Sequence, residues 1–490
     1  MSMTSDFTDL TQLGKCERVL AFDDGSTLVC DEVVRVVPGK RIVLRGNWQG
    51  QAVYAKIFFG RDARRYAQRD RRGVEALLAA HIATPALLHV AMIADQAVVL
   101  VFAAVTDSVN AEQAWTTMHV EQRRELARKL VAEVARHHAA GLMQSDLYLK
   151  NFLLQDTRIL TLDGDGIRPL PHFLRERAAL ANLARLLSKF DIEHEAAWLP
   201  ALLAHYAEMR GLPAAPALSA MQKRVETLRR SAINRYAERK VFRQCTDVEV
   251  RQDWQRYTAV ARGDVDEITR NALLAPEALM AAAERLLKRG NTCTVALATA
   301  GPRKVVVKRY NIKSFWHGLG RAWRPSRAAA SWSNAHRLRM SGIVTAAPLA
   351  LVERRWGILR REAWFTAEYV EAPDAVAFFA GDASVAQKDE AAERIAHLFH
   401  KLYLLQLAHG DLKASNILMA GGQPVLIDLD AMRQYRCRRL FHRRHVRDLR
   451  RFMQNWRRDE STYVCFTAAF ERVYQNPTLL SEAGIVKRIK

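Results

Sequence analysis

The amino-acid sequence predicts an α+β chain in which a small strand-rich segment, followed by a larger helical segment, occurs twice. Three observations lead to this fold class. The chain has 490 residues, whereas a single hydrophobic core stops growing near about 250–300 residues. Short apolar strands are followed by amphipathic helices, and this order repeats. Two polar loops with the same spacing of aspartate and asparagine stand at corresponding places in the two halves.

The first half of the chain opens with strands and then becomes helical. From about Val120, apolar residues recur every four positions, which is one face of an amphipathic helix. A loop at Met143–Lys150 follows, and helices then extend to about residue 210. Short apolar or alternating runs bounded by Pro38-Gly39 and by other glycines predict strands at Val33–Val37, Arg41–Arg45, Val53–Phe59, Ala97–Val105, Asn151–Leu154 and Ile159–Leu162, with a helix over 63–81.

The best break between two domains lies at 211–216, where glycine, proline and alanine gather. A basic helical stretch over 222–240 leads into the second half. There the same order returns: strands at Thr294–Ala298 and Val305–Tyr310, a helix over 326–340, a strand over 364–370, a long helix and a loop over 408–415. We therefore expect two domains, residues 1–235 and 236–490.

Each half carries the same set of polar residues. In the first, Asp146 precedes Asn151 by five residues and Asn151 precedes Asp163 by twelve. In the second, Asp411, Asn416 and Asp428 follow at the same intervals, and a strand lysine, Lys56 or Lys308, stands upstream of each set. A single aspartate in such a loop is usually a turn residue. The repeated order and spacing favour a shared chemical function instead.

The residue types suit phosphoryl transfer, in which catalysis is mostly positioning and charge neutralisation. A strand lysine can hold the α- and β-phosphates of ATP. Asparagine and the later aspartate are hard oxygen ligands suited to Mg²⁺. The first aspartate can orient an acceptor hydroxyl and accept its proton. The pattern therefore predicts ATP and Mg²⁺ as cofactors.

These segments resemble the protein-kinase-like superfamily, and in particular the bacterial lipopolysaccharide core kinases, which phosphorylate heptose or Kdo sugars. The resemblance rests on the segments 409–418, 146–154 and 307–311, with Thr84-Pro85, and it spans most of the chain. It implies two bilobal kinase-like domains in tandem, each with a small β-rich lobe and a larger helical lobe. It also implies the following roles: Asp411 and Asp146 catalytic, Lys308, Lys56 and Lys413 binding ATP, and Asn416, Asp428, Asn151 and Asp163 binding metal.

The two copies differ in their loops. The first has Gln144 where the second has His409, a residue that is mainly structural in related kinases. It also has Tyr148 where the second has Lys413. A lysine there can neutralise charge on the transferred phosphoryl group, and a tyrosine cannot. On these grounds we expect the second domain to be catalytic and the first to be a weaker kinase or a pseudokinase.

The second copy has a defect of its own. A helical acid usually holds the strand lysine, but no Asp or Glu occurs between Lys308 and Glu353. The corresponding helix offers Asn334 and His336. The first copy offers Asp70 or Glu75, and the sequence does not choose between them. Neither copy has a GxGxxG phosphate loop, for which Gly46 and Gly50, or Gly290 and Gly301, are weak substitutes.

A run of arginines follows Asp428. Such side chains can grip phosphates or the carboxylates of Kdo, or hold anionic lipid head groups. A solvated basic helix without a ligand is the alternative. Asp448, twenty residues after Asp428, is expected to anchor the catalytic loop, and Asn182 is its counterpart nineteen residues after Asp163. The arginines that we assign to anion binding are Arg436, Arg438, Arg439, Arg443 and Arg444.

The net charge of +22 predicts an anionic partner. We expect lipopolysaccharide core, or a lipid A-core precursor, and the anionic inner-membrane surface. No nucleic acid is expected, because no aromatic stacking pattern accompanies the arginines. Met1–Leu10 has no apolar run, and the longest apolar run, Ala97–Val105, is far too short to span a bilayer. The six cysteines show no paired spacing. These features favour a cytoplasmic protein, peripheral on the inner face of the membrane.

Two functions remain open from the sequence. The first is an ATP-dependent phosphotransferase that acts on a sugar hydroxyl of the lipopolysaccharide core. The second is a tandem pseudokinase that binds lipopolysaccharide or its biosynthetic enzymes as a scaffold. A small-molecule phosphotransferase of the antibiotic-kinase type shares the fold but explains the arginines less well. The sugar, the activity of the first domain, the partner of Lys308 and the oligomeric state are not determined by the sequence.

Overall fold

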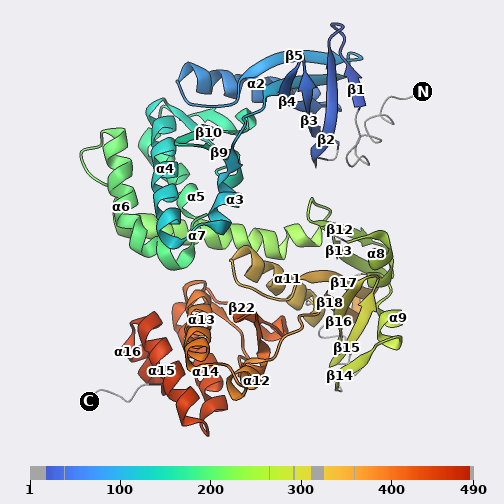
Figure 1. Ribbon diagram of the computed structural model, residues 1–490, viewed down its shortest axis with the longest axis vertical. Helices are drawn as coiled ribbons and strands as arrows, with labels where there is room; N and C mark the ends of the chain where they lie inside the picture. The colour runs from blue at the N-terminus through green and yellow to red at the C-terminus, as the bar shows by residue number, and fades with distance from the viewer. Residues whose placement is uncertain are drawn as a thin grey trace. The chain divides into compact units, whose positions relative to one another are not determined.

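The computed structural model describes residues 18–37, 39–263, 265–290, 293–310, 325–357 and 359–485. The segment Met1–Leu10, Pro38 and Asn311, which the sequence analysis used, lie outside these ranges. The chain divides into two compact units, Met1–Arg229 and Arg230–Lys490, with the division inside α7 (Leu218–Glu238). Each unit combines a sheet with a group of helices (Figure 1).

Unit one begins with an antiparallel sheet of six strands in the order β1-β2-β3-β4-β6-β5. Strand β6, second from one edge of this sheet, is buried along nearly its whole length, as its unbroken apolar sequence predicts. Helix α2 (Ala63–Ala79) connects β4 to β5. The strands are β1 (Arg18–Ala21), β2 (Thr27–Val37), β3 (Arg41–Trp48), β4 (Gln51–Phe58), β5 (Leu87–Ile93) and β6 (Ala97–Ala103).

The rest of unit one is mainly helical. Leu126, Leu130 and Val134 of α4 are buried in one core with residues of α5 and α6, as the four-residue repeat predicts. Gly211 ends α6 with a φ of 60°, a left-handed conformation that suits glycine. The elements are β7 (Val109–Asn110), α3 (Ala111–Thr117), α4 (Val120–Ala139), β8 (Leu142–Gln144), β9 (Phe152–Gln155), β10 (Arg158–Thr161), β11 (Ile167–Pro169), α5 (Arg175–Leu187) and α6 (Ile192–Arg210).

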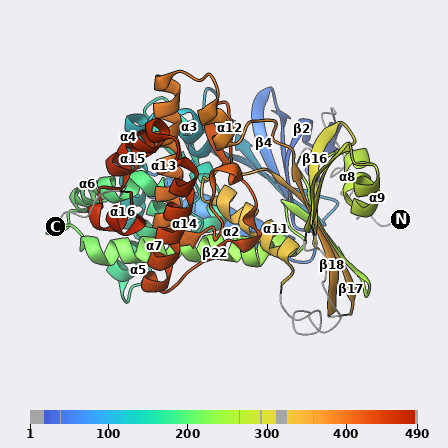
Figure 2. The same cartoon turned by 90° about the horizontal axis from the view of Figure 1, so that it is seen from below.

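Unit two has an antiparallel sheet of seven strands in the order β12-β13-β17-β18-β16-β15-β14. Helices α8 (Glu267–Leu273) and α9 (Pro276–Ala281) cover one face of it, and α11 (Arg327–Met340) lies on the other (Figure 2). The strands are β12 (Val248–Gln252), β13 (Arg256–Ala261), β14 (Arg285–Arg289), β15 (Cys293–Ala300), β16 (Arg303–Tyr310), β17 (Pro348–Trp356) and β18 (Leu359–Glu368).

The helical part of unit two packs around aromatic side chains. Phe399 of α13, Phe452 of α14 and Phe470 of α15 are fully buried, with ring centroids 5.1 to 6.1 Å apart. The elements are α12 (Ala375–Ala380), α13 (Val385–Leu404), β19 (Leu407–Ala408), β20 (Ile417–Ala420), β21 (Gln423–Leu426), β22 (Arg433–Gln434), α14 (Arg438–Met453), α15 (Glu460–Tyr474) and α16 (Pro477–Ala483).

Several strands were not predicted from the sequence. They are β5, β12, β13 and β17. β12 carries charges at alternating positions, and β13 and β17 pair with each other although they are distant in the sequence, so a local apolar pattern does not reveal them. β5 pairs with the adjacent β6, and this explanation does not apply to it. β17 pairs with β18 over nearly its full length and completes the sheet around Lys308. Sheet membership therefore depended on pairing that only the tertiary structure supplies.

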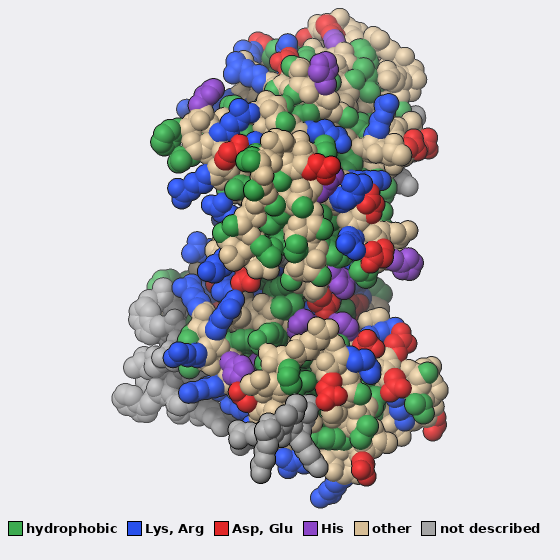
Figure 3. Space-filling view, turned by 90° about the vertical axis from the view of Figure 1, so that its left-hand side faces the viewer, with side chains coloured by type: hydrophobic (Ala, Val, Ile, Leu, Met, Phe, Trp, Pro, Cys, Tyr) green, Lys and Arg blue, Asp and Glu red, His purple; other side chains and the backbone are tan. Residues whose placement is uncertain are grey.

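The surface of the described part of the chain is strongly charged. Figure 3 shows Lys and Arg side chains spread over the face that it draws, with Asp and Glu between them. Among the described residues, no helix is both long and apolar enough to cross a membrane. The described cysteines, five in number, are unpaired.

Candidate active site

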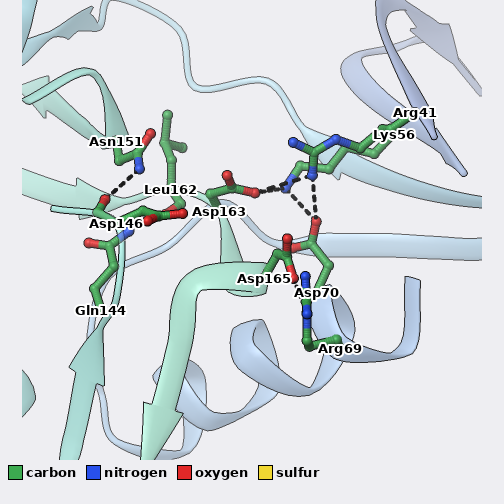
Figure 4. Close-up of polar contacts among 10 residues, drawn as sticks. All are labelled: Arg41, Lys56, Arg69, Asp70, Gln144, Asp146, Asn151, Leu162, Asp163 and Asp165. Carbon is green, nitrogen blue, oxygen red and sulfur yellow. Dashed lines mark hydrogen bonds and ion pairs between the residues drawn. The ribbon is translucent and has the colours of Figure 1, made fainter. Parts of the chain in front are cut away.

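Lys56 lies at the centre of a cluster of charged side chains in unit one. β4 places it between Val43 of β3 and Leu100 of β6. Its Nζ atom lies 2.7 Å from Oδ2 of Asp70 and 3.1 Å from Oδ1 of Asp163 (Figure 4). The strand lysine is thus held by a helical acid and by the aspartate that follows the loop.

The acid that holds Lys56 is Asp70, a choice that the sequence left open. Asp70 lies on the buried face of α2 and its side chain is inaccessible to solvent. Glu75 lies on the exposed face, where it pairs with Arg71 at 2.6 Å. Five residues along a helix turn a side chain by well over a right angle, so the two acids cannot share one face.

Helix α2 packs so closely against the loop after Asp163 that the two backbones are in contact. A Cβ atom placed on Gly73 would lie 1.9 Å from the carbonyl oxygen of Gly164. A Cβ on Gly164 would lie 2.3 Å from the carbonyl oxygen of Asp70. Both positions therefore require glycine, and this contact fixes Asp70 relative to Asp163.

The loop before Asp163 is closed by side-chain hydrogen bonds. Nδ2 of Asn151 donates to the carbonyl oxygen of Asp146 at 2.7 Å, and Nε2 of Gln144 donates to the carbonyl oxygen of Leu162 at 2.9 Å. The amide of Leu162 donates to the carbonyl of Asn151 at 2.8 Å. These bonds bring Asp146, Asn151 and Asp163 to one side of the site (Figure 4).

Unit two has the same bonds in the same places. Nδ2 of Asn416 donates to the carbonyl oxygen of Asp411 at 2.8 Å, and Nε2 of His409 donates to the carbonyl oxygen of Ile427 at 3.0 Å. Burial lowers the pKa of His409, which keeps its ring neutral. Gln144 therefore makes in unit one the bond that His409 makes in unit two, so this difference leaves the loop geometry intact.

The aspartate after each loop has a strained backbone. Asp163 has a φ of 66° and Asp428 a φ of 62°, both left-handed. Burial opposes ionisation of each carboxyl group, but neighbouring cations outweigh burial and lower the pKa. For Asp163 these cations are Lys56 and Arg41, and for Asp428 the main one is Lys308. Both aspartates are therefore carboxylates at neutral pH.

Lys308 of unit two finds its partner in the loop rather than in the helix. Its Nζ atom lies 3.0 Å from Oδ1 of Asp428. Asn334 of α11 instead donates to the carbonyl oxygens of Leu429 and Met432, at 2.8 and 2.9 Å. His336 is buried, and no described residue forms a hydrogen bond with its Nε2 atom.

Asp448 anchors the loop that contains Asp411, as predicted. This buried carboxylate accepts hydrogen bonds from the amides of His409, at 2.8 Å, and Gly410, at 3.1 Å. Asn182 of α5 occupies the corresponding place in unit one. Its Nδ2 donates to the carbonyl oxygen of Gln144 at 2.8 Å. Both helices thus hold the start of their loop.

The arginines of α14 divide into two groups. Arg451 forms an ion pair with Asp411, and Arg447 donates to the carbonyl oxygen of Gly410 at 3.2 Å. The structure thus brings the later arginines of the tract, rather than those assigned to anion binding, onto the loop. The assigned set is solvent-exposed at the start of α14 and just before it: Arg436, Arg438, Arg439, Arg443 and Arg444.

Two lysine side chains lie near the ring of Tyr148, which stands where unit two has Lys413. Nζ of Lys189 lies 4.4 Å from the centre of its ring, and Nζ of Lys150 lies 5.5 Å away. Positive charge is therefore present beside the loop of unit one, from side chains that the sequence did not single out.

Strand register shows which glycine-containing turn lies nearer to each strand lysine. In unit one it is the turn before β3, which contains Gly39 (φ 68°), because Arg41 at the start of β3 pairs with Phe58, two residues beyond Lys56. Gly46 and Gly50 lie toward the other end of this hairpin. In unit two, Gly290 lies at the corresponding turn and Gly301 at the opposite end of β15. The sequence marked Gly39 only as a strand boundary, because its neighbours show no phosphate-loop pattern.

The residues present fit a magnesium ion. In each loop the asparagine donates through Nδ2, which leaves its amide oxygen for a cation beside the aspartate carboxylate. Among the described residues there is no group of three or more His, Cys, Asp or Glu placed to hold a metal. Any metal would therefore depend on this aspartate and asparagine pair, together with a bound phosphate.

The fold and the site define a phosphotransferase unit of the protein-kinase-like class: a strand lysine and a loop aspartate form an ion pair below a small sheet, and an aspartate–asparagine loop precedes them. Residues 278–470 match the family model described as the lipopolysaccharide kinase (Kdo/WaaP) family. The matched residues all lie within the second unit. The matched range contains Lys308, Asp411, Asn416 and Asp428.

Among solved structures, the crystal structure of the BubR1 kinase domain is similar to part of the chain. It is 11% identical in sequence, covers 46% of this chain and 90% of its own, and has a TM-score of 0.30. No curated protein matches the chain.

Proposed function

We propose that the chain is a tandem kinase-like protein in which unit two transfers phosphate from ATP to a hydroxyl of heptose or Kdo in the lipopolysaccharide core. The observation that carries this proposal is the family match over residues 278–470, which contains the loop and lysine geometry described above. The equivalent bonds around Lys56 and Asn151 support a second kinase-like domain in unit one.

Each residue of unit two then has one task. Lys308 holds the α- and β-phosphates, and Lys413 neutralises charge on the transferred group. Asp411 orients the acceptor hydroxyl and accepts its proton, which requires Arg451 to release its carboxylate. Asn416 and Asp428 would hold Mg²⁺, which when bound neutralises phosphate charge.

The acceptor explains the exposed arginines of α14. Phosphates and Kdo carboxylates in the lipopolysaccharide core are anions that guanidinium groups bind in bidentate fashion. The arginines at the start of α14 stand on the same helix as Arg451, which contacts Asp411. We propose that they bind the anionic core and hold the protein at the anionic surface of the inner membrane.

Two matched substitutions test the assignment. We expect Asp411→Asn to abolish phosphate transfer from ATP to core oligosaccharide or lipid A-core, detected by mass spectrometry, because the acceptor loses its base. Asp146→Asn makes the same change in unit one and should leave most of the activity. If only Asp146→Asn abolished transfer, unit one would be the catalytic domain.

A scaffold without catalysis is the second candidate. It is favoured by Lys308, whose ion-pair partner among the described residues is Asp428, because that carboxylate would have to serve both the lysine and a metal. Calorimetric titration with ATP and Mg²⁺ separates the two functions. If neither unit bound nucleotide, the kinase function would be refuted.

A further inference from the structure

Arg41 is a second cation in the site of unit one. It stands on β3 opposite Phe58, two residues along from Lys56. Its Nη1 atom lies 3.4 Å from Oδ1 of Asp163 and 3.6 Å from Oδ2 of Asp70. The side chain is 13% exposed, and Figure 4 shows it approaching both carboxylates together with Lys56.

The four groups form a balanced set of two cations and two anions. Buried charges persist only when they are paired, and arginine stays protonated at any physiological pH. Asp70 has no exposed side-chain surface. Arg41 therefore compensates the negative charge of Asp163, the carboxylate to which we assign metal binding, and of Asp70.

Unit two lacks both members of the Arg41–Asp70 pair. In its sheet, Cys293 stands opposite Tyr310, two residues beyond Lys308, which is the position that corresponds to Arg41. No acid is present in α11. The two units thus differ by one cation and one anion. Both charges are present in unit one and both are absent from the corresponding positions of unit two, which indicates that Arg41 and Asp70 function as a pair.

We propose that Arg41 enables unit one to bind a nucleoside triphosphate without a divalent cation. The inference rests on the proposed nucleotide site of unit one. A phosphate that enters beside Lys56 competes with Asp163 for the Arg41 guanidinium, which binds phosphate in bidentate fashion. Asp70 keeps hold of Lys56 during this exchange, at 2.7 Å.

Fluorescent mant-ATP titrated into the full chain tests the proposal. Lys308→Ala with Asp428→Asn removes the nucleotide site of unit two. We expect similar affinity, within about threefold, in excess EDTA and in Mg²⁺. Arg41→Cys, which copies unit two, should weaken binding in EDTA by about tenfold or more and recover in Mg²⁺. Arg41→Lys should retain part of the binding.

Three results would overturn the proposal. The first is binding that requires Mg²⁺ while Arg41 is present. The second is an equal loss for Arg41→Cys with and without Mg²⁺, after thermal unfolding has shown that the variant is folded. The third is absence of mant-ATP binding under both conditions, which would refute the nucleotide site of unit one itself. Transfer by unit two is measured separately, so its failure is distinguishable.

A pocket elsewhere in unit one carries an independent inference. It has a volume of about 370 Å³ and lies between α4, α6, the β9–β10 turn and the residues after α2. None of the residues in the Lys56 cluster lines it. Its lining contains no acid: His81, Ala83, Arg128, Lys129, Ala132, Arg136, Thr157, Arg158, Ile159, His205 and Met209.

The cations of the pocket are of two kinds. Arg128 is held by two hydrogen bonds of 2.9 Å to Glu125, and Arg136 is held by buried Glu133. Their guanidinium groups are therefore positioned in advance, which lowers the entropic cost of binding. Lys129 and Arg158 have no ion-pair partner within the described ranges of the chain.

The geometry points to a site for a phosphate monoester, for example on a sugar. We expect glucose 6-phosphate to bind the full chain in calorimetry at low ionic strength, and Lys129→Glu with Arg158→Glu to weaken binding at least tenfold. Arg124→Glu, an exposed charge reversal on the same helix, should not. Equal losses in both variants, no binding, or binding only to phosphatidylglycerol vesicles would overturn the proposal.

Discussion

Gly73→Ala tests whether the contact between α2 and the Asp163 loop positions Lys56. Alanine favours a helix over glycine by about 1 kcal/mol, so propensity alone predicts stabilisation. The structure predicts the opposite sign, because the new Cβ would lie 1.9 Å from the carbonyl oxygen of Gly164. An ordinary carbon–oxygen contact is about 3.3 Å.

The size of the effect follows from this overlap. Relief of the clash requires α2 to move by about 1.4 Å, which would stretch the 2.7 Å contact between Lys56 and Asp70 toward the limit of an ion pair, about 4 Å. Overpacking costs about 1–3 kcal/mol, and loosening of the buried pair adds to that. After the gain in helix propensity, we expect Gly73→Ala to lower the free energy of unfolding by about 1–3 kcal/mol.

Hydrogen exchange measured by mass spectrometry is the suitable assay, because a chain of two units need not unfold in one step. Peptides from α2 and from the loop after Asp163 should exchange faster in Gly73→Ala, and mant-ATP should bind unit one more weakly. Gln68→Ala, an exposed change in the same helix, is the control and should have little effect. Slower exchange of α2 in Gly73→Ala would refute the packing argument.

Three further outcomes are expected. Asp448→Ala leaves two loop amides without their acceptor, at about 1–3 kcal/mol each, so the loop should exchange faster, and less so in Asp448→Asn. Arg451→Ala removes an exposed ion pair with Asp411 and should change the free energy of unfolding by no more than about 1 kcal/mol, while phosphate transfer should persist, because Asp411 no longer has to be released; loss of transfer would contradict this. Burial lowers the pKa of His138 to about 4 from 6.5, so unit one should lose stability as pH falls from 6.5 toward 4, and His138→Gln should flatten this dependence.

The motifs could be read from the sequence because their spacing is local. Asp411 and Asn416 lie in one loop, and a short hairpin returns the chain to Asp428. Asp146 and Asn151 likewise lie in one loop, and a short hairpin returns the chain to Asp163. Hydrogen bonds within and beside each loop then complete a geometry that the residue types already suggested.

The residues that contact these motifs could not be predicted from the sequence, because they belong to other helices and strands. Arg41 reaches Asp163 across more than a hundred residues, and its strand pattern shows no sign of that contact. Nothing in the sequence distinguishes Arg451 from the neighbouring arginines, but in the structure α14 brings it into an ion pair with Asp411. Strand register and helix packing make these choices, and both depend on tertiary structure.

By itself, the sequence determined the α+β class, the repeated Asp–Asn–Asp spacing and the strand lysines, since each is a property of a short segment. Only the tertiary structure decided that Asp70 rather than Glu75 holds Lys56, that Gln144 makes the bond of His409, and that Arg41 joins the cluster. These decisions rest on which helix face is buried and which strands pair. Both are set when separate segments exclude water together and compensate one another's buried charges.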